Sequence, residues 1–215
     1  LLFQNEGMFL KQVPKAVNII SNCNKLYTLY DNNKAEALKH PYLSAVHIIG
    51  TFISRKKTNS VAKSRQYRWE HFYKKIVPKL TKEYDVAIAY MQREQTYFLV
   101  DKVKAAKKIT WVHNEYSQLG HFKEMDLEYF EKVDKVVTIS DLCAKDLKEN
   151  FPSIAEKFVV LPNLTSSQVI RSLAKEFYPP EFKRDMLNIV SIGRLNAQKG
   201  FEFALDAALE LKKSK

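Results

Sequence analysis

The chain has 215 residues, 46% of them hydrophobic, so it can bury a full core and is not a disordered protein. Five glycines occur and none forms a G-x-G-x-x-G or P-loop motif, which argues against a dehydrogenase or an NTPase, while two distant cysteines, Cys23 and Cys143, predict a reduced protein without a metal site. The net charge of +11 is concentrated in residues 55–82, where ten Lys or Arg face one acidic residue, Glu70.

The N-terminal part predicts one strand and one long apolar helix. The opening residues, Leu1-Leu2-Phe3, are typical of the end of a strand, so we expect the chain to be a fragment. Residues 17–23 predict a further strand because they are rich in β-branched side chains. Pro41 suits the start of a helix that runs to about residue 54 and is apolar nearly all round. This run is too short to span a bilayer, so we expect it to pack deep or to lie near a membrane.

Residues 60–77 predict a second long helix, basic on one side and ended by Pro78. With the end of the preceding helix it forms what we call the basic patch. The members of the basic patch are Arg55, Lys56, Lys57, Lys63, Arg65 and Arg68. Two interpretations are open, a solvated cationic face above an ordinary core stripe or a surface that meets anionic lipid head groups. Nucleic acid is a weaker alternative, because no recognition motif accompanies the patch, and we expect no nucleic-acid partner.

Four further strands alternate with helical segments. They are predicted near residues 85–91, 107–112, 135–140 and 157–161. This alternation predicts an α/β fold with a doubly wound parallel sheet, truncated at both ends. We place the first domain at residues 1–177, a linker at 178–186 and the first strand and helix of a second domain at 187–215.

Residues 187–200 predict a strand, a short loop and the start of a helix. The strand carries alternating aliphatic residues, and the loop carries Arg194 and Lys199. Loop amides and helix N-termini at the carboxyl ends of strands favour anions, so two cations there suit a diphosphate. The alternative is a solvated turn with a capping glycine.

Several polar residues follow predicted strands directly. Gln92-Arg93-Glu94, His113, Ser140 and Asn163 each lie at the carboxyl end of a strand. In a doubly wound sheet these ends line one cleft, and Arg194 has the same position after its own strand. Ser140 is also a good helix N-cap, which is the stronger interpretation of that residue.

The motif I-G-R-L-x-x-x-K-G-F at residues 192–201 resembles the opening of the donor-binding domain in family 4 of the retaining glycosyltransferases, which have the two-domain GT-B fold. The segment T-W-V-H-N resembles the active-site histidine region of that family, and residues 136–147 and 162–164 are similar to two further family segments, with Leu164 where the family has glycine. The resemblance implies that Arg194 and Lys199 contact the diphosphate of a nucleotide-sugar and that His113 contacts the transferred sugar. It leaves Ser140 and Asn163 as cleft-lining candidates.

The function implied is transfer of a sugar, with retention and without a metal or cofactor, from a nucleotide-sugar to a glycan or lipid-linked acceptor. Synthesis of a cell-surface polysaccharide or glycolipid would place the protein in the cytoplasm, on the inner face of the plasma membrane. The family's pair of donor-domain glutamates is expected after Lys215, so we expect this chain alone to be inactive. The exposed 187–215 unit could mediate oligomerisation. The alternative is a non-catalytic membrane-surface or nucleotide-binding module of the same architecture.

Overall fold

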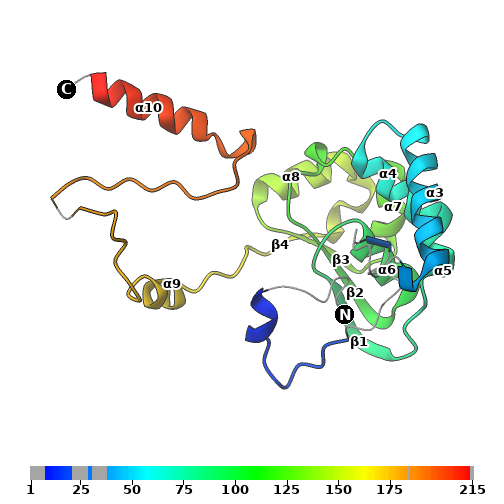
Figure 1. The fold of residues 1–215 in the computed structure, drawn as a ribbon. Coiled ribbons are helices and arrows are strands. Elements are labelled where there is room, and N and C mark those ends of the chain that lie inside the picture. The colour runs from blue at the N-terminus through cyan, green and yellow to red at the C-terminus, as the bar shows by residue number, and fades with distance from the viewer. Residues whose placement is uncertain (1–7, 21–28, 31–37, 184, 214–215) are drawn as a thin grey trace. The chain divides into compact units, whose positions relative to one another are not determined.

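The computed structural model describes residues 8–20, 29–30, 38–183 and 185–213 (Figure 1). The chain divides into two units, Leu1–Asn163 and Leu164–Lys215, and each is described by itself. The predicted strand end at the first three residues lies outside the described part.

The first unit contains a four-stranded parallel sheet. Its strands are β1 (Glu83–Ala89), β2 (Lys104–Val112), β3 (Lys135–Thr138) and β4 (Phe158–Val160). They are hydrogen-bonded in the order β1-β2-β3-β4, and every neighbouring pair is parallel. The four strands predicted between residues 85 and 161 are thereby confirmed, and so is the α/β class with a Rossmann-like parallel sheet flanked by helices.

Three helices connect successive strands of the sheet. They are α6 (Glu94–Lys102), α7 (Lys123–Glu131) and α8 (Asp141–Asn150). Because strand order follows chain order and such crossovers are right-handed, these helices cover the same face. All three contribute buried side chains to one core, in which Tyr97, Phe130 and Leu147 are almost completely inaccessible. On the other face of β1, Val86 and Ile88 are exposed.

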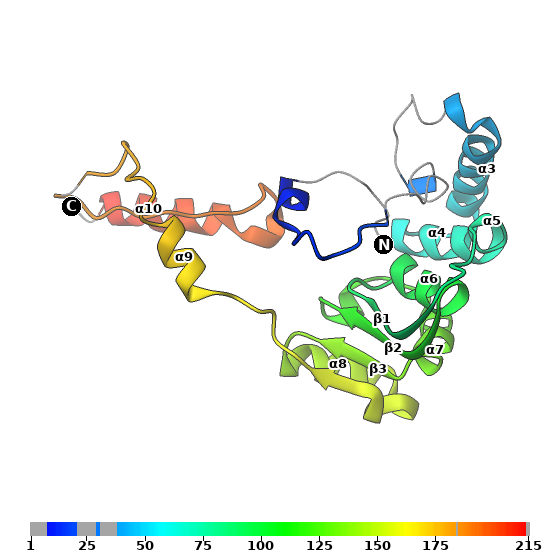
Figure 2. The same ribbon diagram turned by 90° about the horizontal axis from the view of Figure 1, so that it is seen from below.

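A further helical layer packs on this core. It consists of α3 (Pro41–Lys57), α4 (Val61–Arg68), the π-helical turn η2 (Trp69–Tyr73) and α5 (Lys74–Ile76). Figure 2 shows α4 between α3 and α6. Ser60 begins α4, because its side chain accepts a hydrogen bond from the Lys63 amide. Trp69 and Tyr73 are fully buried and join this layer to the core.

The remaining elements are short or belong to the second unit. In the first unit, single 3₁₀ turns are η1 (Met8–Gln12), η3 (Tyr116–Gln118) and η4 (Pro152–Lys157). The second unit contains α9 (Ser167–Leu173), η5 (Ala197–Lys199) and α10 (Phe201–Lys213). No described residue of α9 or α10 is buried.

Two predicted strands are wrong in the described residues. Residues 17–20 form no strand, and the rest of that prediction, residues 21–23, lies outside the described part. Residues 187–192 have irregular backbone although their side chains alternate. A strand needs a neighbour to accept and donate its backbone hydrogen bonds, and no strand is described in the second unit.

The boundary between the units also lies earlier than predicted. It falls after Asn163, so α9 groups with the second unit and not with the first domain. The prediction took the helical pattern of residues 165–177 as the end of the first domain. Because every residue of α9 is exposed, this helix adds nothing to the core of the sheet.

A buried carboxylate connects the helical layer to the sheet connections. Asp126, at the start of α7, accepts hydrogen bonds from Tyr97, from Tyr116 (2.8 Å), from Nδ1 of His121 (2.7 Å) and from the amide of Gln66 (3.2 Å). Burial and the negative charge of Asp126 raise the pKa values of Tyr97 and Tyr116, so both phenols remain donors at neutral pH. One side chain therefore satisfies donors from several elements.

We predict that Asp126→Ala lowers the free energy of unfolding by about 3 kcal/mol or more, because it leaves four buried donors without their acceptor. Urea unfolding followed by circular dichroism measures the change. The control is Glu124→Ala, which removes an exposed carboxylate of the same helix and should change stability by less than about 0.5 kcal/mol. Equal effects of the two substitutions would contradict the role given to Asp126.

Candidate functional site

His113 lies directly after β2 and is held by the end of β1. Its Nε2 atom lies 2.8 Å from the backbone oxygen of Tyr90. The two rings meet edge to face, with centroids 4.9 Å apart. The backbone amide of His113 also donates to the side-chain oxygen of the buried Gln92, at 3.5 Å. Two neighbouring strand ends thus fix the position of one half-buried imidazole.

The contact with Tyr90 determines which ring nitrogen of His113 is available. A carbonyl oxygen only accepts, so Nε2 must carry the hydrogen. In the neutral ring Nδ1 is then an acceptor, and it can take a hydrogen bond or a proton from the hydroxyl of a ligand. This is the chemistry that a sugar hydroxyl requires.

A buried ion pair lies at the same strand end. Glu94 begins α6, and its side chain is only 2% exposed. Its carboxylate is paired with Nε of Arg65 and lies 3.8 Å from Nε of Arg93. Burial lowers the pKa of Arg65, but the charge and hydrogen bond of Glu94 outweigh it and the net shift is upward. Arg65 is therefore a permanent cation of this cluster.

The backbone at Arg93 is strained. Its φ of 68° is the one positive value at a non-glycine residue in the described chain, and its ψ is −123°. These angles match the first central residue of a type II′ turn, which is usually glycine. Strain of this kind costs about 1 to 3 kcal/mol and is often found at functional sites. Here it turns the chain from β1 directly into α6, beside the group that holds His113.

Ser140 and Asn163 follow β3 and β4. The Ser140 side chain accepts a hydrogen bond from the Cys143 amide at 3.2 Å and so caps α8, as its preferred interpretation predicted. Asn163 is exposed beyond β4. Both lie at the same edge of the sheet as His113, because the carboxyl ends of parallel strands meet there.

Arg194 and Lys199 lie on one compact loop of the second unit. The Asn196 amide donates to the Arg194 carbonyl at 2.9 Å, and the Lys199 amide donates to the Asn196 carbonyl at 3.0 Å. Gly200 then takes a left-handed conformation, with a φ of 61°, before α10 begins. A Cβ atom at Gly193 would lie 3.2 Å from Cγ of Lys199, so glycine there lets the lysine stem fold against the loop. Both cations are exposed.

The structure separates the six residues of the basic patch into two groups. Arg55, Lys56 and Lys57 are exposed at the end of α3. The other three contact the protein: Lys63 lies over the Phe122 ring at 5.1 Å, Arg65 is paired with Glu94, and Arg68 donates to Thr51 at 2.8 Å. The prediction that all six face a membrane is therefore wrong for Arg65 and Arg68, because their guanidinium groups are bound within the fold.

The sequence prediction missed the pairing of Arg65 with Glu94. These residues are far apart in the chain, and Arg65 was grouped with its neighbours by charge alone. The polar triplet Gln92-Arg93-Glu94 was the available signal, because it separates an apolar strand from a helix. A buried acidic residue at that point needs a cation, and α4 supplies it.

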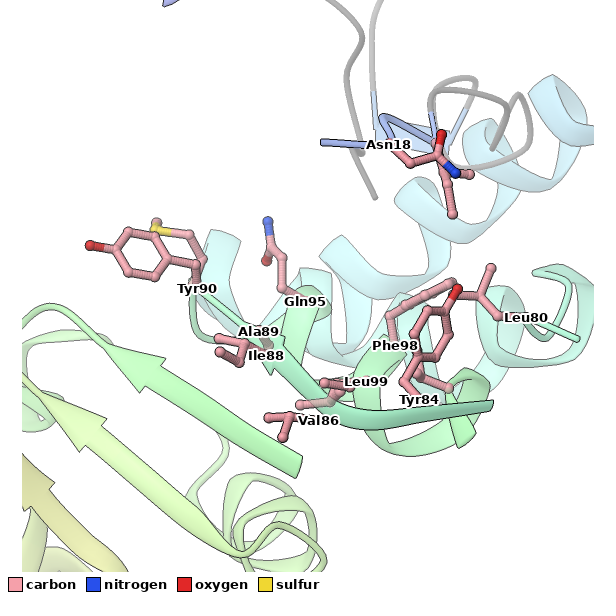
Figure 3. A pocket seen from close by; sticks show the side chains of 14 residues that line it. Asn18, Leu80, Tyr84, Val86, Ile88, Ala89, Tyr90, Gln95, Phe98 and Leu99 are labelled. Atoms are coloured by element: carbon pink, nitrogen blue, oxygen red, sulfur yellow. The ribbon is translucent and has the colours of Figure 1, made fainter. Parts of the chain in front are cut away.

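A hollow of about 450 Å³ lies beside β1 and α6 (Figure 3). Its lining is almost entirely apolar, with Tyr84, Ile88, Phe98 and Leu99 among the side chains that face it. None of the described lining residues is charged. The hollow therefore offers no cation for a diphosphate, and we do not assign a donor site to it.

Metal ligands and membrane spans were sought in the described residues as well. Within them, no group of three or more His, Cys, Asp or Glu is arranged to hold a metal ion. Nor does any helix in the described ranges combine the length and the apolar character that crossing a membrane requires.

Comparison of the chain with models of known protein families, with curated proteins and with solved structures gave no match.

We predict that His113 carries its hydrogen on Nε2 in the neutral ring, because that atom must donate to Tyr90. The ¹⁵N spectrum of labelled protein distinguishes the two tautomers. The chain has five histidines, so the spectrum of His113→Gln identifies the signal that belongs to this residue. A neutral ring with its hydrogen on Nδ1 would contradict the geometry described here.

We also predict that Arg93→Gly is more stable than Arg93→Ala by about 1 kcal/mol, because only glycine adopts a φ of 68° with a ψ of −123° at little cost. Both variants lack the arginine side chain, so their difference isolates the backbone strain. Thermal and urea unfolding of the two proteins measure it. If alanine were as stable as glycine, the turn would not be strained.

Proposed function

We propose that the chain is part of a retaining glycosyltransferase that transfers a sugar from a nucleotide-sugar to a glycan or lipid-linked acceptor. The observation that carries the proposal is the loop from Gly193 to Gly200. It holds two exposed cations, Arg194 and Lys199, immediately before the N-terminus of α10. Its sequence resembles the diphosphate-binding loop of the family 4 enzymes.

The loop suits the leaving group of this reaction. A departing nucleoside diphosphate gains negative charge, and cations fixed by a compact loop stabilise that charge without reorganising. The first amides of α10 have no acceptor within the helix and add positive potential at the same end. In the proposed reaction Arg194 and Lys199 bind the diphosphate, and no metal or cofactor takes part.

His113 is proposed to contact the transferred sugar. The imidazole is held through Nε2, which leaves Nδ1 to accept from a sugar hydroxyl. Ser140 and Asn163 remain proposed cleft-lining residues. Of the two, Asn163 is the better candidate for a ligand contact, because the Ser140 hydroxyl is engaged as a helix cap.

The proposal extends to partners and location. Synthesis of a cell-surface polysaccharide or a glycolipid would place the protein in the cytoplasm, peripheral on the inner face of the plasma membrane. Self-association is proposed through residues 187–215, where large apolar side chains such as Ile192 and Leu205 are exposed. We propose no nucleic-acid partner.

In the full-length protein, Arg194→Ala and Lys199→Ala should each lower sugar transfer by roughly 10- to 150-fold, since loss of one charge-assisted hydrogen bond costs about 1.5 to 3 kcal/mol. A transfer assay with several nucleotide-sugars measures this effect. The matched control is Lys212→Ala, which removes an exposed cation at the far end of α10. Unchanged transfer after Arg194→Ala would remove the residue on which the proposal rests.

His113→Ala should lower turnover in the same assay while the KM for the donor changes little, because the imidazole is proposed to contact the sugar and not the diphosphate. Calorimetry of residues 1–215 with the same nucleotide-sugars should show no tight binding, since the family's glutamate pair is expected outside this chain. Tight donor binding by this chain alone would contradict that division of roles.

A further inference from the structure

One side of α3 is apolar and open to solvent. Tyr42, Ile48, Ile49 and Phe52 are between 53% and 67% exposed. Their spacing of three or four residues puts them on one face of the helix, opposite the buried Leu43, Gly50 and Ser54. We call these four side chains the α3 face. Exposure of four large apolar groups together is unusual and indicates a binding surface.

Cations border the α3 face at its C-terminal end. Arg55, Lys56 and Lys57 form the last turn of α3 and are exposed. Nζ of Lys56 lies 4.3 Å from the centroid of the Phe52 ring, so charge and apolar surface are contiguous. The sequence from residue 38 to residue 69 contains no acidic residue. A partner that neutralises this surface must therefore supply the negative charge itself.

We propose that the α3 face is a membrane anchor that lies in the head-group region of an anionic bilayer. The apolar side chains enter the boundary with the acyl chains, and the cations of the last turn contact lipid phosphates. The 17 residues of α3 extend about 25 Å, and they lie along the surface instead of crossing it. This inference deepens the peripheral location proposed above and names the element responsible.

The bilayer fits better than a protein partner for two reasons. The apolar and cationic groups are divided along the helix, as in interfacial helices, and the aliphatic stems of the lysines can extend from the acyl boundary to the phosphates. The two arginines bound within the fold, Arg65 and Arg68, take no part. The surface is thus narrower than the basic patch and includes apolar residues that charge alone did not indicate.

The test is co-sedimentation of the chain with phosphatidylcholine vesicles, with and without phosphatidylglycerol. Binding should require the anionic lipid and weaken as salt rises. Arg55→Gln, Lys56→Gln and Lys57→Gln combined should reduce affinity about a hundredfold, or roughly fivefold for each cation. The control changes Lys145, Lys148 and Lys175 to Gln, which alters net charge equally at exposed positions elsewhere.

The apolar contribution needs its own variants. Ile48→Ser with Phe52→Ser should weaken binding at least tenfold, whereas Leu142→Ser, at an exposed leucine of α8, should not. In a Phe52→Trp variant, fluorescence should be quenched by brominated lipids, because the indole enters the acyl boundary. The native Trp69 is fully buried, and the unsubstituted protein gives the background from both native tryptophans.

Three outcomes would overturn the proposal. Binding of equal strength to neutral vesicles, or unchanged binding of the serine or glutamine variants, would exclude the anchor as described. Self-association lost on Phe52→Ser, with no binding to anionic vesicles, would show that the face meets a second copy of the chain. None of these measurements involves sugar transfer, so failure here leaves the proposed enzymatic function untouched, and the reverse also holds.

Discussion

The first unit depends on a single buried carboxylate. Asp126 accepts hydrogen bonds from residues of α4, α6, η3 and the loop before α7. A charge without such donors would be costly inside a protein, and four phenol, imidazole or amide donors without the charge would be equally unsatisfied. The helical layer can therefore pack in one arrangement only. That arrangement places α6 and α4 against each other and brings Arg65 to Glu94.

The candidate site follows from this packing. With α6 fixed, the chain must turn sharply after β1, and Arg93 takes the strained conformation that the turn demands. The same turn places the Tyr90 carbonyl and the Gln92 side chain against His113 on the next strand. A parallel sheet gathers such groups at its carboxyl edge whatever their distance in sequence. The geometry of His113 is thus a consequence of the helix beneath it.

The excess of positive charge serves different purposes in different places. Arg65 neutralises a buried acid, and Arg68 binds Thr51. The cations at the end of α3 have no such internal role and border an apolar face. Those of the 193–200 loop are exposed beside a helix N-terminus. Charge counted along the sequence is the same in each case, and only the surroundings distinguish structural from binding cations.

The sequence by itself determined the elements that rest on local patterns. The four strands from β1 to β4 follow from runs of β-branched residues, and Ser140 caps α8 because its hydroxyl lies three residues from a free amide. Tertiary structure decided the rest. Residues 187–192 carry a strand pattern but have no partner strand in their unit, and strands form only in pairs. Arg65 and Glu94 meet because the fold brings α4 to α6, a long-range contact that no local pattern contains.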